Sequence, residues 1–234
     1  MNDTTTDPTY AVASRQGTRP HNADATAVRR LGEKTAAALV DGIGSTPEVA
    51  ECSRLLAQVA ARVGVRRGVL AGLLAAAELV ADGDPDGEDA VAVLAVTRPG
   101  KTTRIAWVGD ARAYGWDGTR LRRYTTDHTV GQQLRVNGVP VELAEQHDNW
   151  IRTSLGCAVV ATVYTVEIPA GELVVLTSDG VHDALAPDVL EALIRDHADD
   201  PQALTDTLVG AVVEDDDGDR DDATAVVGAP RPSG

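Results

Sequence analysis

The chain of 234 residues has only two cysteines, no phenylalanine and no long uninterrupted apolar segment. Cys52 and Cys157 lie far apart and no Cys-x-x-Cys pair occurs, which excludes a zinc finger and a disulfide scaffold. The longest apolar run, residues 69–81, contains Glu78 and is too short to cross a bilayer. Residues 1–9 are polar and acidic, unlike a signal peptide. We therefore expect a soluble cytoplasmic protein.

Positive charge is also scarce. Lys and Arg number 21 against 36 Asp and Glu, so the net charge is −15. Because a field of this sign repels nucleic-acid backbones and anionic lipid, we expect neither as a partner. The sequence contains no Gly-x-Ser-x-Gly motif, so a hydrolase nucleophile of that kind has no candidate position.

The apolar patterning predicts strands in groups, with helices in pairs between them. The expected strands cover residues 24–28, 35–40, 90–96, 102–108, 111–116, 121–124, 173–177 and 223–227. The expected helices cover residues 45–63, 68–81, 129–137, 141–147, 187–195 and 201–213. Paired helices favour a layered α+β fold with antiparallel sheets over a doubly wound sheet. We expect one domain over residues 11–228, with disordered tails at 1–10 and 229–234.

Four aspartates lie beside predicted strands. Asp41 and Asp179 each follow a β-prone run and precede a glycine, Asp110 follows such a run after one glycine, and Asp221 comes just before the last strand. Strand ends can direct side chains to one rim of a sheet, and several carboxylates gathered there cannot all stay ionised without cations. Hard oxygen ligands favour Mg²⁺ or Mn²⁺. A single Asp-Gly pair is most simply a turn. It is the set of four aspartates beside predicted strands that indicates a metal site.

Seven segments, in order over residues 19–227, match the motifs of one family. They are Arg19-Pro20-His21-Asn22-Ala23-Asp24, Asp41-Gly42-Ile43-Gly44, Val108-Gly109-Asp110-Ala111-Arg112-Ala113-Tyr114, Thr125-Thr126-Asp127-His128-Thr129, Arg152-Thr153-Ser154-Leu155-Gly156, Ser178-Asp179-Gly180-Val181-His182-Asp183 and Asp221-Asp222-Ala223-Thr224. The sequence thus resembles the metal-dependent protein phosphatases, the type 2C serine/threonine phosphatase family, especially its compact bacterial members. The fold implied is a four-layer α-β-β-α sandwich: two antiparallel sheets flanked by helix pairs, with the metals at one end.

The resemblance also implies a set of metal ligands for Mn²⁺ or Mg²⁺. Asp41 would bridge two ions, and the carbonyl of Gly42 would bind one of them. Asp179 and Asp221 would bind the other. Asp110, together with Asp179, would serve a third and weaker ion.

The implied reaction is hydrolysis of phosphoserine or phosphothreonine in proteins, without a phosphoenzyme. A hydroxide bridging the two metals would attack phosphorus, Arg19 would hold the phosphate, and Asp24 would order metal-bound water. Ala23 stands where the family has Glu or Gln, and Asp222 stands where it has Asn. Neither change removes a ligand, so we expect an active enzyme.

The implied partners are phosphorylated proteins, substrates of a serine/threonine kinase, and we expect a monomer. Two alternatives stay open at this point. One is a catalytically weak relative that binds phosphoproteins as a signalling module. The other is a hydrolase of small phosphate esters that uses the same site.

Overall fold

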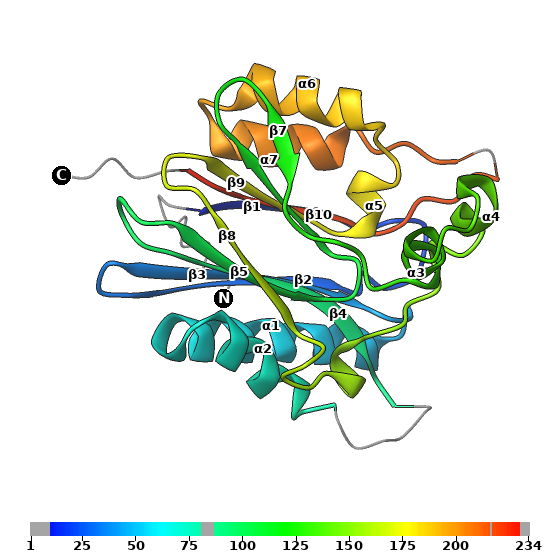
Figure 1. The fold of residues 1–234 in the computed structure, drawn as a ribbon, viewed down its shortest axis with the longest axis horizontal. Coiled ribbons are helices and arrows are strands. Elements are labelled where there is room, and N and C mark those ends of the chain that lie inside the picture. The colour runs from blue at the N-terminus through cyan, green and yellow to red at the C-terminus, as the bar shows by residue number, and fades with distance from the viewer. Residues whose placement is uncertain (1–9, 81–86, 216, 230–234) are drawn as a thin grey trace.

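Two five-stranded antiparallel sheets lie face to face at the centre of the molecule (Figure 1). The computed structural model describes residues 10–80, 87–215 and 217–229. The first sheet has the order β1 (Tyr10–Arg15), β10 (Ala223–Gly228), β9 (Leu173–Thr177), β6 (Arg112–Trp116), β7 (Leu121–Arg123). The second has the order β2 (Asp24–Leu31), β3 (Lys34–Gly42), β4 (Ala90–Thr97), β5 (Thr103–Val108), β8 (Tyr164–Ile168).

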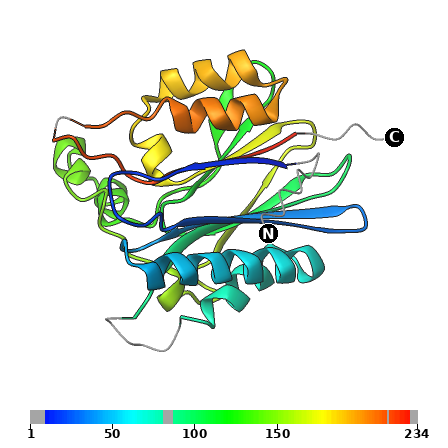
Figure 2. The ribbon, with the colours of Figure 1, turned by 180° about the vertical axis from the view of Figure 1, so that it is seen from behind.

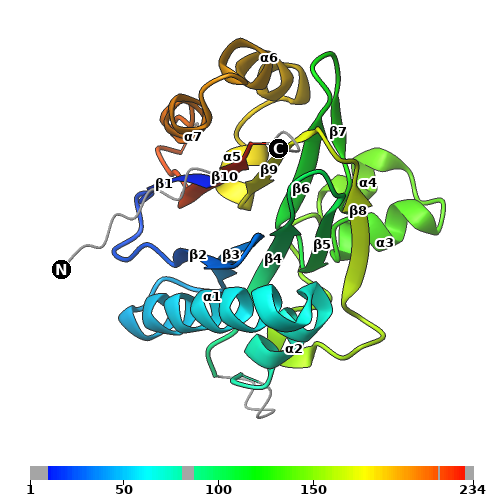
Figure 3. The ribbon, with the colours of Figure 1, turned by 90° about the vertical axis from the view of Figure 1, so that its left-hand side faces the viewer.

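A helix pair covers the outer face of each sheet, as the view in Figure 3 shows. Helices α1 (Pro47–Arg67) and α2 (Val69–Ala77) pack on the second sheet, and α6 (Pro187–His197) and α7 (Pro201–Gly210) pack on the first. Shorter helices are α3 (Val130–Val136), α4 (Val141–Glu145), α5 (Asp179–His182) and a 3₁₀ turn at Leu155–Cys157. The four-layer α-β-β-α sandwich predicted from the sequence is confirmed.

The inner strands are apolar on both faces because each sheet lies between two layers. On β3, Leu39 belongs to the core between the sheets, whereas Ala38 and Val40 belong to the core beneath α1 and α2. Successive side chains of a strand point to opposite faces, so a strand buried on both sides reads as one continuous apolar run. This explains why β3, β4 and β9 are visible in the sequence.

Thr46 starts α1 by accepting a hydrogen bond from the backbone N–H of Val49 at 3.2 Å, and Pro47 occupies the first turn. Gly68, at φ +99°, separates α1 from α2. The cap fixes the start of α1 soon after β3 ends at Gly42. No helix among the described residues has both the length and the apolar character that a membrane span needs.

Some sequence predictions need correction. Tyr10 is buried and begins β1, so the expected tail of residues 1–10 includes the first residue of a strand; residues 1–9 and 230–234 lie outside the described part of the chain. Strands β1 and β8 were not predicted. Figure 2 shows β1, in blue, beside β10, in red. Both unpredicted strands lie at sheet edges and carry partly exposed side chains, so their apolar signal is weak.

Candidate functional site

The predicted site aspartates meet at one end of the sandwich, and we call Asp24, Asp41, Asp110, Asp179 and Asp221 the acidic rim. Asp24 begins β2 and Asp41 lies near the end of β3, where the two are direct cross-strand partners. Asp110 follows β5, Asp179 is the first residue of α5, and Asp221 comes just before β10. These strands belong to both sheets, so the rim spans the gap between them.

Asp41 lies on β3 of the second sheet and Asp179 lies just after β9 of the first, and the two carboxyl groups are close enough for each to shift the pKa of the other. Burial raises the pKa of Asp41 well above its ordinary value, and the neighbouring Asp179, Asp24 and Asp110 raise it further. Burial, followed by the charge of Asp221, raises the pKa of Asp179 to about 6. A proton or a cation between these carboxyl groups would offset their mutual repulsion.

Asp110 shows the same effect. It is buried, and burial together with the charges of Asp179 and Asp127 raises its pKa to about 7. Near neutral pH the rim thus retains protons that ordinary exposed aspartates would have lost.

A hydrogen bond holds one carboxylate oxygen of Asp24 in place, and the other oxygen has no partner. Its Oδ2 atom accepts a hydrogen bond from the Ser178 hydroxyl at 2.8 Å, and the Ser178 oxygen accepts the backbone N–H of Thr224 at 3.0 Å. Burial raises the pKa of Asp24. Its Oδ1 atom is buried and has no hydrogen-bond partner. An ordered water or a cation-bound water at the rim would satisfy this atom.

Arg19 lies against a predicted metal ligand. Its Nη2 atom is 2.8 Å from Oδ2 of Asp221, and the two side chains are 48% and 35% exposed. The resemblance gives Arg19 a role in phosphate binding and none at the metals, whereas here it is paired with an expected metal ligand. A pair this exposed contributes at most about 1 kcal/mol to stability, so Arg19 can leave Asp221 at little cost.

In the sequence, Asp222 is notable only because the family has Asn at this position. In the structure, its carboxylate holds a loop in place. Its two carboxylate oxygens accept the backbone N–H groups of Gly17 and Ala23, each at 2.8 Å. Asp222 is buried, and the two bonds fix both ends of the loop that carries Arg19. A β-carbon on Gly17 would approach the carbonyl oxygen of Arg220 to 2.1 Å, so the loop needs glycine there.

Asp89 is a second residue that the sequence reasoning missed. Its carboxylate accepts hydrogen bonds from the Ser154 hydroxyl and from the backbone N–H of Gly156, the latter at 2.8 Å. Its own backbone carbonyl accepts the N–H of Ile43 at 2.9 Å. Asp89 therefore connects the segment around residue 155 to the backbone just after Gly42. Nothing in a single sequence marks a residue whose partners are a backbone N–H group and a distant serine.

The donor atoms of the acidic rim suit a divalent cation, but they do not form a complete coordination site. Within the described ranges, no three acidic, histidine or cysteine side chains converge closely enough to hold a metal ion as they stand. The donors are hard carboxylate oxygens, which Mg²⁺ and Mn²⁺ prefer. A cation would also replace the protons implied by the raised pKa values of Asp41, Asp110 and Asp179. These residues could thus hold a metal after small side-chain adjustments.

No protein-family model matches the sequence, and no curated protein matches it. Solved structures do match over nearly the whole chain. The Mycobacterium tuberculosis serine/threonine phosphatase PstP/Ppp has a TM-score of 0.75 at 24% identity and covers 95% of this chain and 98% of its own. The PPM Ser-Thr phosphatase MsPP from Mycobacterium smegmatis, in complex with cacodylate, has a TM-score of 0.71 at 26% identity. The match covers 94% of this chain and 97% of MsPP.

The catalytic domain of PstP in complex with two manganese ions is also similar, with a TM-score of 0.72 at 23% identity and coverage of 94% of this chain and 96% of its own. All three neighbours are serine/threonine phosphatases, matched along almost their full length. The chain therefore has the fold of the bacterial PPM-type serine/threonine phosphatases, and the resemblance seen in its sequence is confirmed.

Proposed function

We propose that the chain is a metal-dependent phosphatase that hydrolyses phosphoserine and phosphothreonine in proteins. The observation that carries this proposal is the approach of Asp41 and Asp179 from the two sheets, at a rim where burial and neighbouring carboxyl groups raise the pKa values. The similarity to a phosphatase domain that binds two manganese ions supports the choice of two divalent cations.

Asp41, the carbonyl of Gly42, Asp179 and Asp221 would hold the two ions, and Asp110 with Asp179 would hold a third. When bound, the two ions would lower the pKa of a water molecule shared between them and would screen the charge of the phosphoryl oxygens. The acidic chain favours their arrival, because its net charge of −15 attracts cations.

Arg19 would bind the phosphoryl group. Its guanidinium is 48% exposed, so an incoming phosphate can reach it, and its planar fork matches two phosphate oxygens. The hydrogen bonds that Asp222 accepts from the backbone N–H groups of Gly17 and Ala23 keep the loop of Arg19 in place. Arg19 would thus move from Asp221 to the substrate when a cation takes over that carboxylate.

Asp24 would orient the attacking water. Its free Oδ1 atom is the one buried rim oxygen, among those described, that is left without a hydrogen bond, and Ser178 keeps the carboxylate from rotating. Ser178 is not itself a nucleophile in this scheme, because it is buried and its hydroxyl is already bonded to Asp24. Direct attack by water follows, with no phosphoenzyme.

The test is phosphate release by the Mn²⁺-loaded protein from a phosphoserine peptide, a phosphothreonine peptide and a small aryl phosphate, with Asp41→Asn as the inactive control. We expect turnover of the peptides. Turnover of the aryl phosphate alone would favour a small phosphate-ester hydrolase. Absence of turnover, with tight binding of the phosphopeptides, would favour a phosphoprotein-binding relative.

A further inference from the structure

The end of the sandwich opposite the acidic rim carries a hollow lined by positive charge. The hollow, about 300 Å³ and open to solvent, lies between the α1–α2 junction and the β4–β5 hairpin. Its charged lining residues are Lys34, Arg98, Lys101 and Arg104, and all four are basic. In the whole chain acidic residues outnumber basic ones by 36 to 21, and Lys34 and Lys101 are its only lysines. We call this site the basic hollow.

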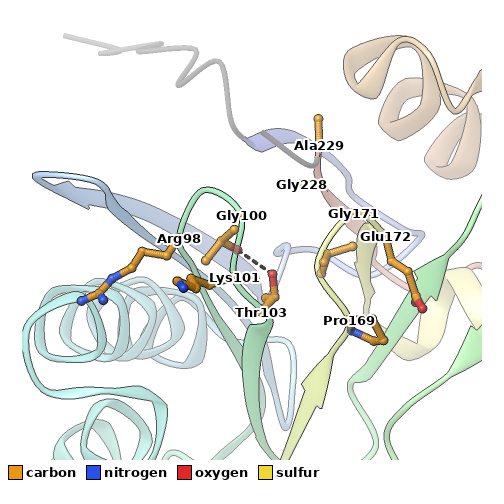
Figure 4. A pocket seen from close by; sticks show the side chains of 11 residues that line it. Arg98, Gly100, Lys101, Thr103, Pro169, Gly171, Glu172, Gly228 and Ala229 are labelled. Atoms are coloured by element: carbon orange, nitrogen blue, oxygen red, sulfur yellow. Dashed lines mark hydrogen bonds between the residues drawn. The ribbon is translucent and has the colours of Figure 1, made fainter. Parts of the chain in front are cut away.

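The backbone creates the space for the basic hollow. Gly68 lines it without a side chain, and a β-carbon there would meet no atom within 4 Å, whereas a β-carbon on Gly64 would approach Leu94 to 2.8 Å. Figure 4 looks at a smaller pocket between the β4–β5 hairpin and the β8–β9 turn. In that view Arg98, which also lines the smaller pocket, extends from the hairpin away from Glu172, on the side where the helices lie. Arg98 and Lys101 both line the basic hollow from the hairpin.

The charges of the basic hollow are poorly neutralised. Arg104 pairs with Glu167 at 3.2 Å, but the two side chains are 67% and 53% exposed, so water screens the pair. Lys34, Arg98 and Lys101 form no ion pair with any carboxylate of the described residues. Three unpaired cations around one hollow repel each other, and an anionic ligand would relieve that repulsion.

We infer that the basic hollow binds an acidic segment of a partner protein through carboxylate or phosphoryl groups. A short peptide suits the site better than a long polyanion does, because the net charge of −15 repels nucleic acid and anionic membrane from the rest of the surface. The positive charge is sufficient to bind anions only within the basic hollow, where a few anionic groups can enter.

The basic hollow is also separate from the acidic rim. Strand β3 runs from Lys34 at the hollow to Asp41 at the rim, and seven steps of about 3.3 Å separate them by roughly 23 Å. A segment held in the hollow would leave the rim accessible. The inference does not rest on the proposed phosphatase activity, and binding can be measured with the rim inactive.

The experiment measures the fluorescence anisotropy of a labelled oligoglutamate peptide and of a phosphoserine peptide, titrated with the full chain in low salt and EDTA. The test variant is Lys34→Gln with Arg98→Gln and Lys101→Gln. The matched control is Arg54→Gln with Arg122→Gln and Arg195→Gln, three exposed arginines on α1, β7 and α6, which changes the net charge equally. We expect the test variant to lose about tenfold or more in affinity, the control to lose less than about threefold, and salt to weaken binding.

Three results would overturn the inference. The first is an equal loss in the test and control variants, which would reflect net charge alone. The second is no binding of either peptide to the wild-type chain at about 1 mM. The third is tighter binding of single-stranded RNA or of phosphatidylserine vesicles than of both peptides, which would assign a different class of partner. Thermal melting of each variant checks that it is folded.

Discussion

The guanidinium of Arg19 lies 2.8 Å from a carboxylate oxygen of Asp221, so the residue predicted to bind phosphate is paired with a residue predicted to bind metal. The pair is half exposed and weak, and a divalent cation at Asp221 would compete with it. Arg19 then serves as the counter-ion of the acidic rim until a metal and a substrate arrive. Mutation can therefore test phosphate binding by Arg19 and metal binding by Asp221 one at a time.

Changing Arg19→Ala should lower kcat/KM for a phosphoserine peptide about ten- to hundredfold, because charge-assisted hydrogen bonds contribute roughly 1.5–3 kcal/mol. Arg19→Lys should recover only part of this loss, since lysine offers a point charge without the fork. Calorimetric titration with Mn²⁺ should show an affinity that is unchanged or higher, because a competing cation is gone. Unchanged kinetics would make Arg19 an ordinary surface residue, and lost manganese would mean that it supports the metal site.

Asp41→Asn and Asp179→Asn should each reduce turnover by at least about two orders of magnitude, because each removes a charged ligand. The same variants should raise the melting temperature of the metal-free protein, since each relieves crowding among buried carboxyls. The exposed Asp199→Asn is the matched control and should change neither quantity. Wild-type turnover in Asp41→Asn would contradict the site assignment.

The metal-free protein should lose stability as pH rises from about 4 to 7. Asp110 and Asp179 have pKa values of about 7 and about 6 in the fold, against an ordinary 3.8, so the folded state binds more protons than the unfolded state in this interval. Each pKa unit corresponds to about 1.4 kcal/mol, so we expect a loss on the order of a few kcal/mol. Urea unfolding in EDTA at pH 5 and pH 8 measures it. Equal stability at both values, or greater stability at pH 8, would contradict the electrostatic description of the rim.

Asp222→Ala should lower the free energy of unfolding by roughly 2–4 kcal/mol, because it leaves the backbone N–H groups of Gly17 and Ala23 without their acceptor. Denaturant unfolding of the metal-free protein measures this effect. The exposed Asp217→Ala, in the same acidic region, should stay within about 0.5 kcal/mol of the wild type. Similar values for the two variants would remove the assigned role of Asp222.

The layered fold could be predicted because its inner strands are buried on both faces. Strand β9 is predicted with the bounds it has, Leu173–Thr177, since all five of its residues are buried. Strand β8, with mostly exposed side chains, gives no comparable signal and was missed. The residues after β9 form the short helix α5, where the sequence predicts only an Asp-Gly turn. Four residues are too few for a helical apolar period to show.

The rim aspartates could also be predicted, because each lies beside a strand and belongs to a recognisable motif. The contacts that position them could not. The bond from Ser178 to Asp24 joins residues 154 positions apart, and the carboxylates of Asp222 and Asp89 accept hydrogen bonds from backbone N–H groups. Backbone donors leave no mark in residue identity, so only the folded chain shows these partners.

The most direct test of the central claim is phosphate release from a phosphoserine peptide by protein stripped of metal with EDTA, then dialysed and supplied with Mn²⁺. We predict no turnover from the stripped protein and full recovery on addition of Mn²⁺, with Mg²⁺ as an alternative activator, because the rim carboxylates require a cation to act together. Full turnover by the stripped protein, with no metal detected in it, would contradict the account.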